Sequence, residues 1–366
     1  MMVFITSAFF VTFLCSALAC AILIATKKHH MRARRGDIEA VQSAHAAPTP
    51  RIGGVAIVFG LVVSVFVSPE TVQSIYLLFI LSLAPVFLAG LAEDLGYRLS
   101  SRLRLIAAAL SSLQAISLLG VWVTHVDILG LDWLLGFTPV AIIFTMFATA
   151  GVCSAFNLID GLNGLSSGTG IVTAMGLAGI AYITGQQQLV LMNLMLIASL
   201  LGFLLFNFPW GKIFLGDAGA YSLGHTLAWF SVILMFKEAE LTPWAIVLVF
   251  FWPLADTLFA MYRRHRSGHP TDQPDRLHFH QLVMRFLEIR FLGRGRRQVA
   301  NPLATLVMLS FVIVPVIFGV LLWDKPFLAF TAVVVFSVVF VGSFLLGISL
   351  LTSLRQVNVR KFGGHK

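Results

Sequence analysis

Charged residues are scarce in this chain. Asp, Glu, Lys and Arg make up 11% of its 366 residues, whereas a soluble globular domain carries roughly 25%. So few charges cannot cover a surface that faces water, while a hydrophobic content of 58% with 32 Phe suits a surface that faces lipid. We therefore exclude a soluble protein of one or two domains and expect an integral membrane protein.

Cysteine is also rare, and its positions exclude two further classes of protein. Cys15, Cys20 and Cys153 lie in apolar runs or at their edges, with neither the spacing of metal ligands nor that of a disulfide framework. We expect them to be buried thiols. The net charge of +9 could suggest a nucleic-acid-binding protein, but the basic residues are confined to a few loops. We expect no nucleic-acid partner.

The N-terminus lacks the basic segment that precedes the apolar core of a cleaved signal peptide. The apolar run 2–25 is long enough to cross a membrane, and basic residues follow it rather than precede it. This order is typical of an uncleaved anchor with its N-terminus outside. Internal repeats and low-complexity tracts are absent as well, so we expect a single transmembrane domain over residues 1–366.

Long apolar runs dominate the rest of the chain. Taking about 20 residues per crossing, we predict eleven spans, near 2–25, 52–68, 72–91, 105–123, 137–156, 168–184, 188–206, 221–236, 242–262, 303–323 and 328–352. The loops on one side hold 23 of the 25 Lys and Arg residues, so the positive-inside rule makes that side cytoplasmic and places the C-terminus there. The predicted fold is an all-α polytopic membrane protein with an active site at its cytoplasmic face.

Polar residues interrupt the apolar pattern in five loops on the cytoplasmic side, near 26–51, 92–104, 157–167, 207–220 and 263–300. The first runs from His45 to the sequence PTPRIGG, which includes Arg51. Its prolines favour an extended chain, and its glycines allow close approach to a ligand or neighbour. The second holds the adjacent acids Glu93 and Asp94. A rigid loop and a solvated helix end are the structural alternatives.

The third and fourth loops carry oxygen ligands. Asn157, Asp160 and Asn163 follow one another at steps of three in the sequence NLIDGLNGL. This spacing places their oxygens on one face of a helix end, which suits a hard cation or a polar ligand. In the fourth loop Asp217 stands next to glycine just before an apolar run. A simple helix N-cap is the alternative for this acid.

The fifth loop is basic. The sequence DRLHFH includes Arg276, His278 and His280 and is followed by Gln281. Two histidines could begin a zinc site, but no further ligands complete the set, so phosphate binding is favoured. Asp256 lies within the ninth predicted span, and an acid inside a membrane is a functional candidate.

Together the loops supply acids and amides for a divalent cation, and histidines and arginines for anions. A diphosphate site at a membrane surface needs this combination, because Mg²⁺ prefers oxygen ligands and is usually shared with substrate phosphates. Arginine in turn binds phosphate oxygens in a bidentate manner.

PTPRIGG, NLIDGLNGL, FLGDAG and DRLHFH, in this order, resemble the motifs of the polyprenyl-phosphate N-acetylhexosamine-1-phosphate transferases, especially the bacterial branch that acts on undecaprenyl phosphate. The resemblance extends from about His45 to Arg290. It implies transfer of a sugar phosphate, most simply GlcNAc-1-phosphate, from a UDP-N-acetylhexosamine to undecaprenyl phosphate in the bacterial inner membrane, with UMP released. It further implies Mg²⁺ as cofactor, with Mn²⁺ as an alternative, and a role in starting the synthesis of O-antigen or other surface glycans. Membrane lipids are expected to contact the protein, and the resemblance leaves open whether it forms a homodimer.

The resemblance also assigns roles to individual residues. Its catalytic positions are Glu93, Asp94, Asp160, His278 and His280. Its substrate-binding positions are His45, Arg51, Asn163, Arg276 and Gln281, among which Asn163 would bind uridine. Its metal ligands are Asp217 and Asn157. Two positions depart from the family pattern: Glu93 replaces an aspartate, and Gln281 replaces the last histidine of His-x-His-His. The family pattern leaves open whether the lipid phosphate attacks directly or an aspartate forms a covalent intermediate.

Three alternatives remain beside this prediction. A secondary transporter would have a similar number of spans, but its polar site should lie near the midplane of the membrane between symmetric repeats. A lipid-binding protein without catalysis would follow if the two departures were inactivating. Within the enzyme class, the phospho-MurNAc-pentapeptide transferases of peptidoglycan synthesis usually have a run of adjacent histidines in the last loop, which is absent here.

Overall fold

The computed structural model describes residues 2–30, 49–266, 277–293 and 295–362, and all regular elements in these ranges are helical. Hydrocarbon offers no water to unpaired backbone groups, so a spanning segment satisfies them within a helix. The elements are α1 (Met2–Ala25), α2 (Lys27–His30), α3 (Gly53–Phe66), α4 (Glu70–Ser82), α5 (Ala84–Asp94), α6 (Ser101–Leu119), α7 (Leu129–Leu135), α8 (Thr138–Leu158), α9 (Leu165–Ile183), α10 (Gln187–Asn207), α11 (Gly216–Lys237), α12 (Pro243–Val249), α13 (Phe251–Arg266), α14 (Phe279–Leu287), the π-helical turn η3 (Glu288–Leu292), α15 (Arg297–Leu321) and α16 (Pro326–Phe362).

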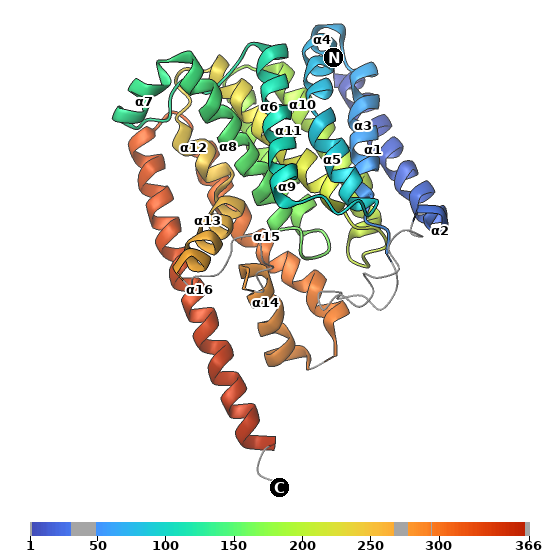
Figure 1. Ribbon diagram of the computed structural model, residues 1–366, viewed down its shortest axis with the longest axis vertical. Helices are drawn as coiled ribbons and strands as arrows, with labels where there is room; N and C mark the ends of the chain where they lie inside the picture. Colours follow the sequence, from blue (N-terminus) through green and yellow to red (C-terminus); the bar gives the residue numbers. More distant parts are fainter. Residues whose placement is uncertain (1, 31–48, 267–276, 294, 363–366) are drawn as a thin grey trace.

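The long helices form one bundle (Figure 1). Within the described residues, eight helices are long and apolar enough to cross a membrane, and two bent pairs, α4 with α5 and α12 with α13, bring the number to ten. The all-α polytopic fold predicted from the sequence is therefore confirmed. The predicted span 52–68 corresponds to α3, which has 14 residues and is short for a complete crossing.

Two predicted spans are broken by bends that the apolar pattern did not indicate. The α4–α5 pair bends by 45° and the α12–α13 pair by 84°. Proline explains both positions, because Pro85 and Pro253 lie in the first turn of the second helix of each pair and lack the N–H that would continue the first. At the first bend, Ser111 Oγ of α6 accepts a hydrogen bond of 2.9 Å from the Val86 N–H, so a neighbouring helix satisfies the interrupted backbone.

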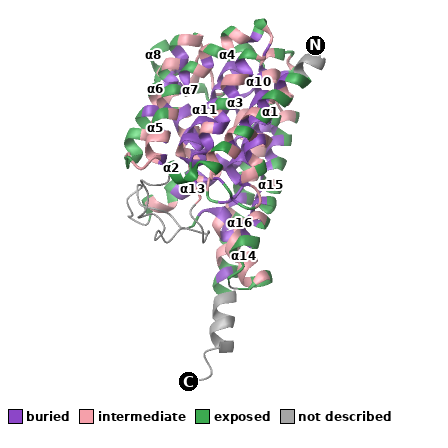
Figure 2. Cartoon of the chain, turned by 90° about the vertical axis from the view of Figure 1, so that its right-hand side faces the viewer, coloured by how far each residue is buried: buried purple, intermediate pink, exposed green. Residues whose placement is uncertain are grey.

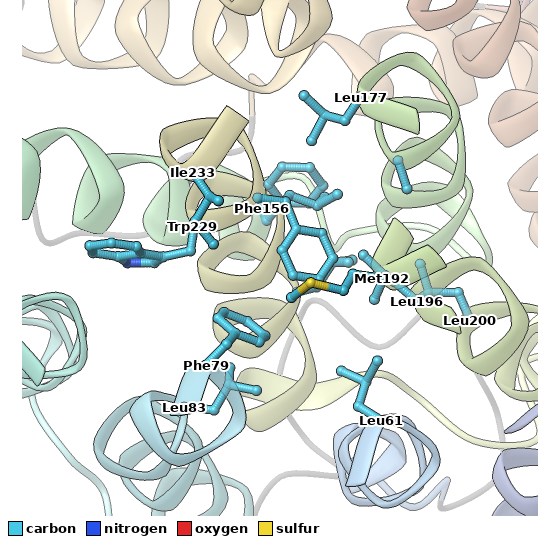
Figure 3. Close-up of a cluster of buried hydrophobic side chains, with 14 of the residues drawn as sticks. Leu61, Phe79, Leu83, Phe156, Leu177, Met192, Leu196, Leu200, Trp229 and Ile233 are labelled. Carbon is cyan, nitrogen blue, oxygen red and sulfur yellow. The ribbon is translucent and has the colours of Figure 1, made fainter. Parts of the chain in front are cut away.

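The core of the bundle surrounds α11. Its spanning segment is 94% buried, whereas that of α16 is 11% buried, so α11 is central and α16 is peripheral. Figure 2 shows the buried residues along the interior of the bundle and the exposed ones on its outer faces. Side chains from six helices meet in this interior (Figure 3), among them Leu61, Phe79, Phe156, Leu177, Met192 and Ile233.

Small residues allow α8 and α11 to approach closely. A Cβ atom at Gly224 of α11 would lie 2.6 Å from the Cα atom of Cys153 in α8. Between helices in lipid, such close approach supplies the van der Waals contacts that replace the hydrophobic effect. Cys153 and Cys20 are buried free thiols, as predicted, and Cys15 is half-buried.

The bundle has two distinct ends. The start of α1 and the short helix α7 lie at one end, while α5 finishes and α9, α11 and α14 begin at or near the other (Figure 1). We call the second end the site end. The C-terminal part of α16 extends beyond it, so the two termini of the chain lie at opposite ends of the bundle.

Candidate active site

The described parts of all five predicted loops are found at the site end (Figure 1). His45 and Arg276 lie outside the described residues. The other ten residues predicted for the site are described. The described part of the fifth loop contains α14 followed by η3.

The PTPRIGG and FLGDAG loops are joined by backbone hydrogen bonds. The Phe214 N–H donates to the Pro50 carbonyl at 2.8 Å, and the N–H groups of Gly53 and Gly54 donate to the carbonyls of Phe214 and Leu215 at 2.9 Å. Two motifs about 160 residues apart in the sequence therefore form one rigid unit. The first loop is thus a structural support for the fourth, whatever its role toward a ligand.

Gly216 allows a third segment to join this unit. Its φ of +74° lies in the left-handed region, which glycine adopts without strain. A Cβ atom here would overlap the Arg51 carbonyl oxygen and lie 2.5 Å from Asp94 Oδ2. A side chain is therefore excluded by both backbone conformation and space.

Asp94 holds the first turn of α11. Its Oδ1 accepts a hydrogen bond from the Asp217 N–H at 2.9 Å, and its Oδ2 accepts one from the Ala218 N–H at 2.8 Å. A carboxylate is well suited to this place because the N-terminus of a helix has unpaired N–H groups and a positive dipole end. Asp94 is 7% exposed, so the alternative of a solvated helix end is wrong for this residue.

Asp217 forms an ion pair with Arg104, which the sequence did not single out. The Arg104 guanidinium contacts Asp217 Oδ2, also donates to Ser101 Oγ at 3.2 Å, and lies over the Tyr221 ring. The N-cap position of α11 is Leu215, without a side-chain cap, so Asp217 is not the simple N-cap considered as an alternative. Its side chain keeps 16% exposure, and Glu93 is close enough to Tyr221 to interact with it electrostatically.

The NLIDGLNGL loop is anchored by three residues that sequence reasoning missed. Asn301 Oδ1 accepts from the Asn163 N–H at 2.9 Å, Thr305 Oγ1 donates to the Asn163 carbonyl at 2.8 Å, and Asn207 Oδ1 accepts from the Gly164 N–H at 2.6 Å. A lone asparagine in or next to an apolar helix was the available signal for Asn207 and Asn301, because an amide in that setting needs a partner.

Asn163 itself is part of this anchor. Its side-chain Nδ2 donates to the Pro209 carbonyl at 2.8 Å, and the residue is 4% exposed. The described residues give its Oδ1 no hydrogen bond. The role of Asn163 toward uridine stays a prediction, and it would depend on that single oxygen.

Asn157, in the last turn of α8, and Asp160, in the loop that follows, are both half-buried. Burial raises the pKa of Asp160 to about 7, while the positive charge of Arg51 acts in the opposite direction. Near neutral pH the carboxyl group is therefore divided between its charged and uncharged forms. A group with such a pKa can both accept and release a proton at neutral pH.

The two histidines of the fifth loop have different surroundings. His278 Nδ1 lies 2.8 Å from Asp256 Oδ2, and both side chains are at least 95% buried. His280 is 2% exposed, its ring is nearly parallel to that of His278, and a Cβ atom at Gly161 would overlap its Nε2. Burial lowers the pKa of His280 to about 4, so His280 is uncharged at neutral pH. Gln281 is half-buried in the first turn of α14.

The donor set suits a metal that is shared with a ligand. Within the described residues, no group of three or more His, Cys, Asp or Glu side chains could hold an ion alone. Mg²⁺ usually binds through one or two carboxylates together with substrate phosphates, and the partly exposed Asp217 already has a cation, Arg104, as its partner. The carboxylate and amide oxygens here therefore fit Mg²⁺ in the presence of phosphate.

The sequence of this chain is similar to those of several known proteins. The sequence pattern of glycosyl transferase family 4 matches residues 76–235. The chain is 30% identical over 244 residues to a probable undecaprenyl-phosphate N-acetylglucosaminyl 1-phosphate transferase of Bacillus subtilis, covering 66% of this chain and 67% of that protein. It is 26% identical to the undecaprenyl-phosphate alpha-N-acetylglucosaminyl 1-phosphate transferase of Yersinia pestis, over 72% and 73% of the two chains. Against the decaprenyl-phosphate N-acetylglucosaminephosphotransferase of Mycobacterium tuberculosis the identity is 29%, over 70% and 69%.

Proposed function

Because this chain belongs to glycosyl transferase family 4, we propose that it transfers N-acetylglucosamine-1-phosphate from a UDP-sugar to undecaprenyl phosphate. The products are undecaprenyl-diphospho-N-acetylglucosamine and UMP. The reaction starts the synthesis of O-antigen or another surface polysaccharide. The observation that carries this proposal is that motif segments far apart in the sequence contact one another. Asp94 accepts a hydrogen bond from the Asp217 N–H, Arg51 is close enough to Asp160 to act on its pKa, and His280, stacked on His278, packs against Gly161.

The distribution of positive residues supports a cytoplasmic location of the site end. The loops predicted to be cytoplasmic carry 23 of the 25 Lys and Arg residues, and the described parts of these loops lie at the site end, so the positive-inside rule favours this orientation. The N-terminus lies outside and the C-terminus in the cytoplasm. UDP-sugars are cytoplasmic molecules, so this orientation gives the site access to its donor.

We assign Asp217 and Asn157 as ligands of Mg²⁺, which when bound would screen the charge of the diphosphate. In the reaction, an oxygen of the lipid phosphate forms a bond to the phosphorus that carries the sugar, and the bond from that phosphorus to the UMP oxygen breaks. In this proposal Arg51 and Arg276 bind phosphate oxygens, His45 and Gln281 are further substrate-binding residues, and Asn163 orients the uridine. Direct attack is favoured because the lipid phosphate already carries negative oxygens and needs alignment more than a covalent relay.

We expect Asp94 to act by stabilising the first turn of α11. Asp94→Asn leaves one acceptor oxygen where α11 presents two N–H groups, so it should lower stability by about 1–3 kcal/mol as well as activity. Glu93→Gln keeps the size of the side chain and removes its charge, so it should lower activity with a smaller change in the midpoint of thermal denaturation than Asp94→Asn. Thermal denaturation in detergent and the transfer assay measure both effects. Equal stability of Asp94→Asn and the wild type would argue for a purely chemical role.

The function is tested with purified protein, radiolabelled UDP-N-acetylglucosamine, undecaprenyl phosphate and Mg²⁺. We expect a labelled lipid diphosphosugar and stoichiometric UMP. Label that crosses a vesicle membrane without attachment to lipid would indicate a transporter, and lipid binding without UMP release would indicate a non-catalytic protein. Replacing the donor by UDP-MurNAc-pentapeptide tests the peptidoglycan branch, for which we expect no product.

A further inference from the structure

Asp256 has no role in the function proposed above, although its position is unusual. It is 2% exposed, lies in α13, and is the only acid in α13 or α14. A buried carboxylate needs partners, because isolated burial of its charge costs several kcal/mol. Asp256 has two. Its Oδ2 lies 2.8 Å from His278 Nδ1, and its Oδ1 accepts a hydrogen bond of 3.1 Å from the Phe279 N–H.

The second bond fixes the carboxylate relative to α14. The Phe279 N–H belongs to the first residue of this helix, and His278 at the N-cap makes no side-chain cap. Asp256 therefore caps α14 from a different helix. Its Oδ1 is held by backbone, so its Oδ2 is directed at the His278 ring.

The contact between Asp256 Oδ2 and His278 Nδ1 determines which ring nitrogen of His278 carries the hydrogen. An ionised carboxylate oxygen can only accept a hydrogen bond, so Nδ1 of His278 must carry the hydrogen. When the imidazole is neutral, Nε2 then has the free lone pair. His278 differs in this respect from His280, whose Nε2 is buried against Gly161 and has no hydrogen-bond partner in the described part of the chain.

We propose that Asp256 is a positioning residue that keeps the hydrogen of His278 on Nδ1, so that Nε2 accepts the remaining proton of the attacking lipid phosphate and returns it to the phosphate oxygen of the departing UMP. This inference rests on the proposed transfer reaction. It gives the two histidines separate roles, since His278 handles the proton and His280 packs against the NLIDGLNGL loop. It also leaves Asp94, whose two oxygens are engaged by α11, as a structural acid.

Asp256→Asn distinguishes this role from simple support. An amide has one acceptor oxygen and one NH₂ donor. If its oxygen stays on the Phe279 N–H, its NH₂ faces Nδ1 of His278 and moves the ring hydrogen to Nε2. Nε2 then loses its lone pair. We expect kcat to fall by roughly a hundredfold, the usual contribution of general acid–base catalysis, with a change of less than about threefold in KM for the UDP-sugar.

The tautomer can be observed directly and without turnover. In protein with ¹⁵N-labelled histidine, the His278 signals, assigned by their loss in His278→Gln, should show Nδ1–H in the wild type and in Asp256→Glu, and Nε2–H in Asp256→Asn. The same tautomer in the wild type and Asp256→Asn would overturn the proposal, whether or not the wild type transfers sugar phosphate. Failure of the wild type in the transfer assay alone would instead overturn the proposed function.

Two further variants complete the test. Asp132→Asn is the matched control, since Asp132 Oδ1 also accepts a backbone hydrogen bond, from the Val126 N–H at 2.6 Å, but lies in α7 at the opposite end of the bundle. It should keep full activity. In the His278→Gln background, Asp256→Asn should cause no further loss of kcat. An additional loss as large as in the wild type would show that Asp256 acts independently of His278.

Discussion

Asp217→Asn is expected to reduce transfer by at least about a hundredfold while the protein remains folded in the membrane. The substitution keeps the size of the side chain and removes its charge, so it removes the proposed metal ligand and the partner of Arg104. Loss of a metal ion that stabilises developing negative charge in a transition state costs several kcal/mol, and Asp217 is proposed to hold that ion. The backbone bond from residue 217 to Asp94 does not depend on the side chain, so the start of α11 should be preserved.

The measurement is the initial rate of UMP release as a function of Mg²⁺ concentration, with equal amounts of detergent-purified wild type and variant. Asp132→Asn again serves as the control for loss of one acidic side chain. Activity of Asp217→Asn above about a tenth of the wild type at saturating Mg²⁺, with normal thermal stability, would contradict the metal role. A parallel loss of stability would instead assign the effect to the Arg104 pair.

Gly54→Ala should destabilise the candidate site by disturbing the packing of α3 against the first turn of α11. A Cβ atom at this position would lie 2.5 Å from the Cα atom of Gly219 and 2.7 Å from the carbonyl carbon of Ala218. These are backbone atoms of the first turn of α11, so no side chain can move aside. Overpacking of this kind costs about 1–3 kcal/mol, and the displacement would reach Asp217, because it precedes Ala218 in the same turn.

We expect a fall of roughly 5 °C in the midpoint of thermal denaturation together with a large loss of transfer activity. Gly151→Ala is the matched control. It replaces a glycine within α8 around which a Cβ atom would meet nothing within 4 Å, and alanine favours helix over glycine. Stability of Gly54→Ala equal to that of Gly151→Ala would mean that α3 and α11 can separate without cost.

The sequence predicted the parts of the fold that depend on apolar length. Runs of about 20 apolar residues indicate helices wherever lipid surrounds them, and the structure confirms these helices. It did not predict the 84° bend between α12 and α13, because proline is tolerated within membrane helices when neighbours satisfy the freed backbone. Pro302 and Pro315 lie inside α15, which continues through both.

The sequence predicted residues of the candidate site better than it predicted the contacts that these residues make. Asp94, Asp217 and His278 interrupt apolar runs and were therefore conspicuous. Arg104 was counted only among the basic loop residues, because its pairing with Asp217 depends on how α6 packs near α11. Asn207, Asn301 and Thr305 were missed for the same reason, since each supports a loop far away in the sequence. The spacing of residues within a motif carries no information on such partners.

Helix α16 is longer than the hydrocarbon core of a bilayer is thick. Its 37 residues extend about 55 Å at a rise of 1.5 Å per residue, against a hydrocarbon thickness of about 30 Å. Even a tilt of about 40°, at the upper end of the observed range, leaves a vertical height above 40 Å. The last turns of α16 must therefore leave the hydrocarbon core at the site end and continue into the headgroup layer or beyond it.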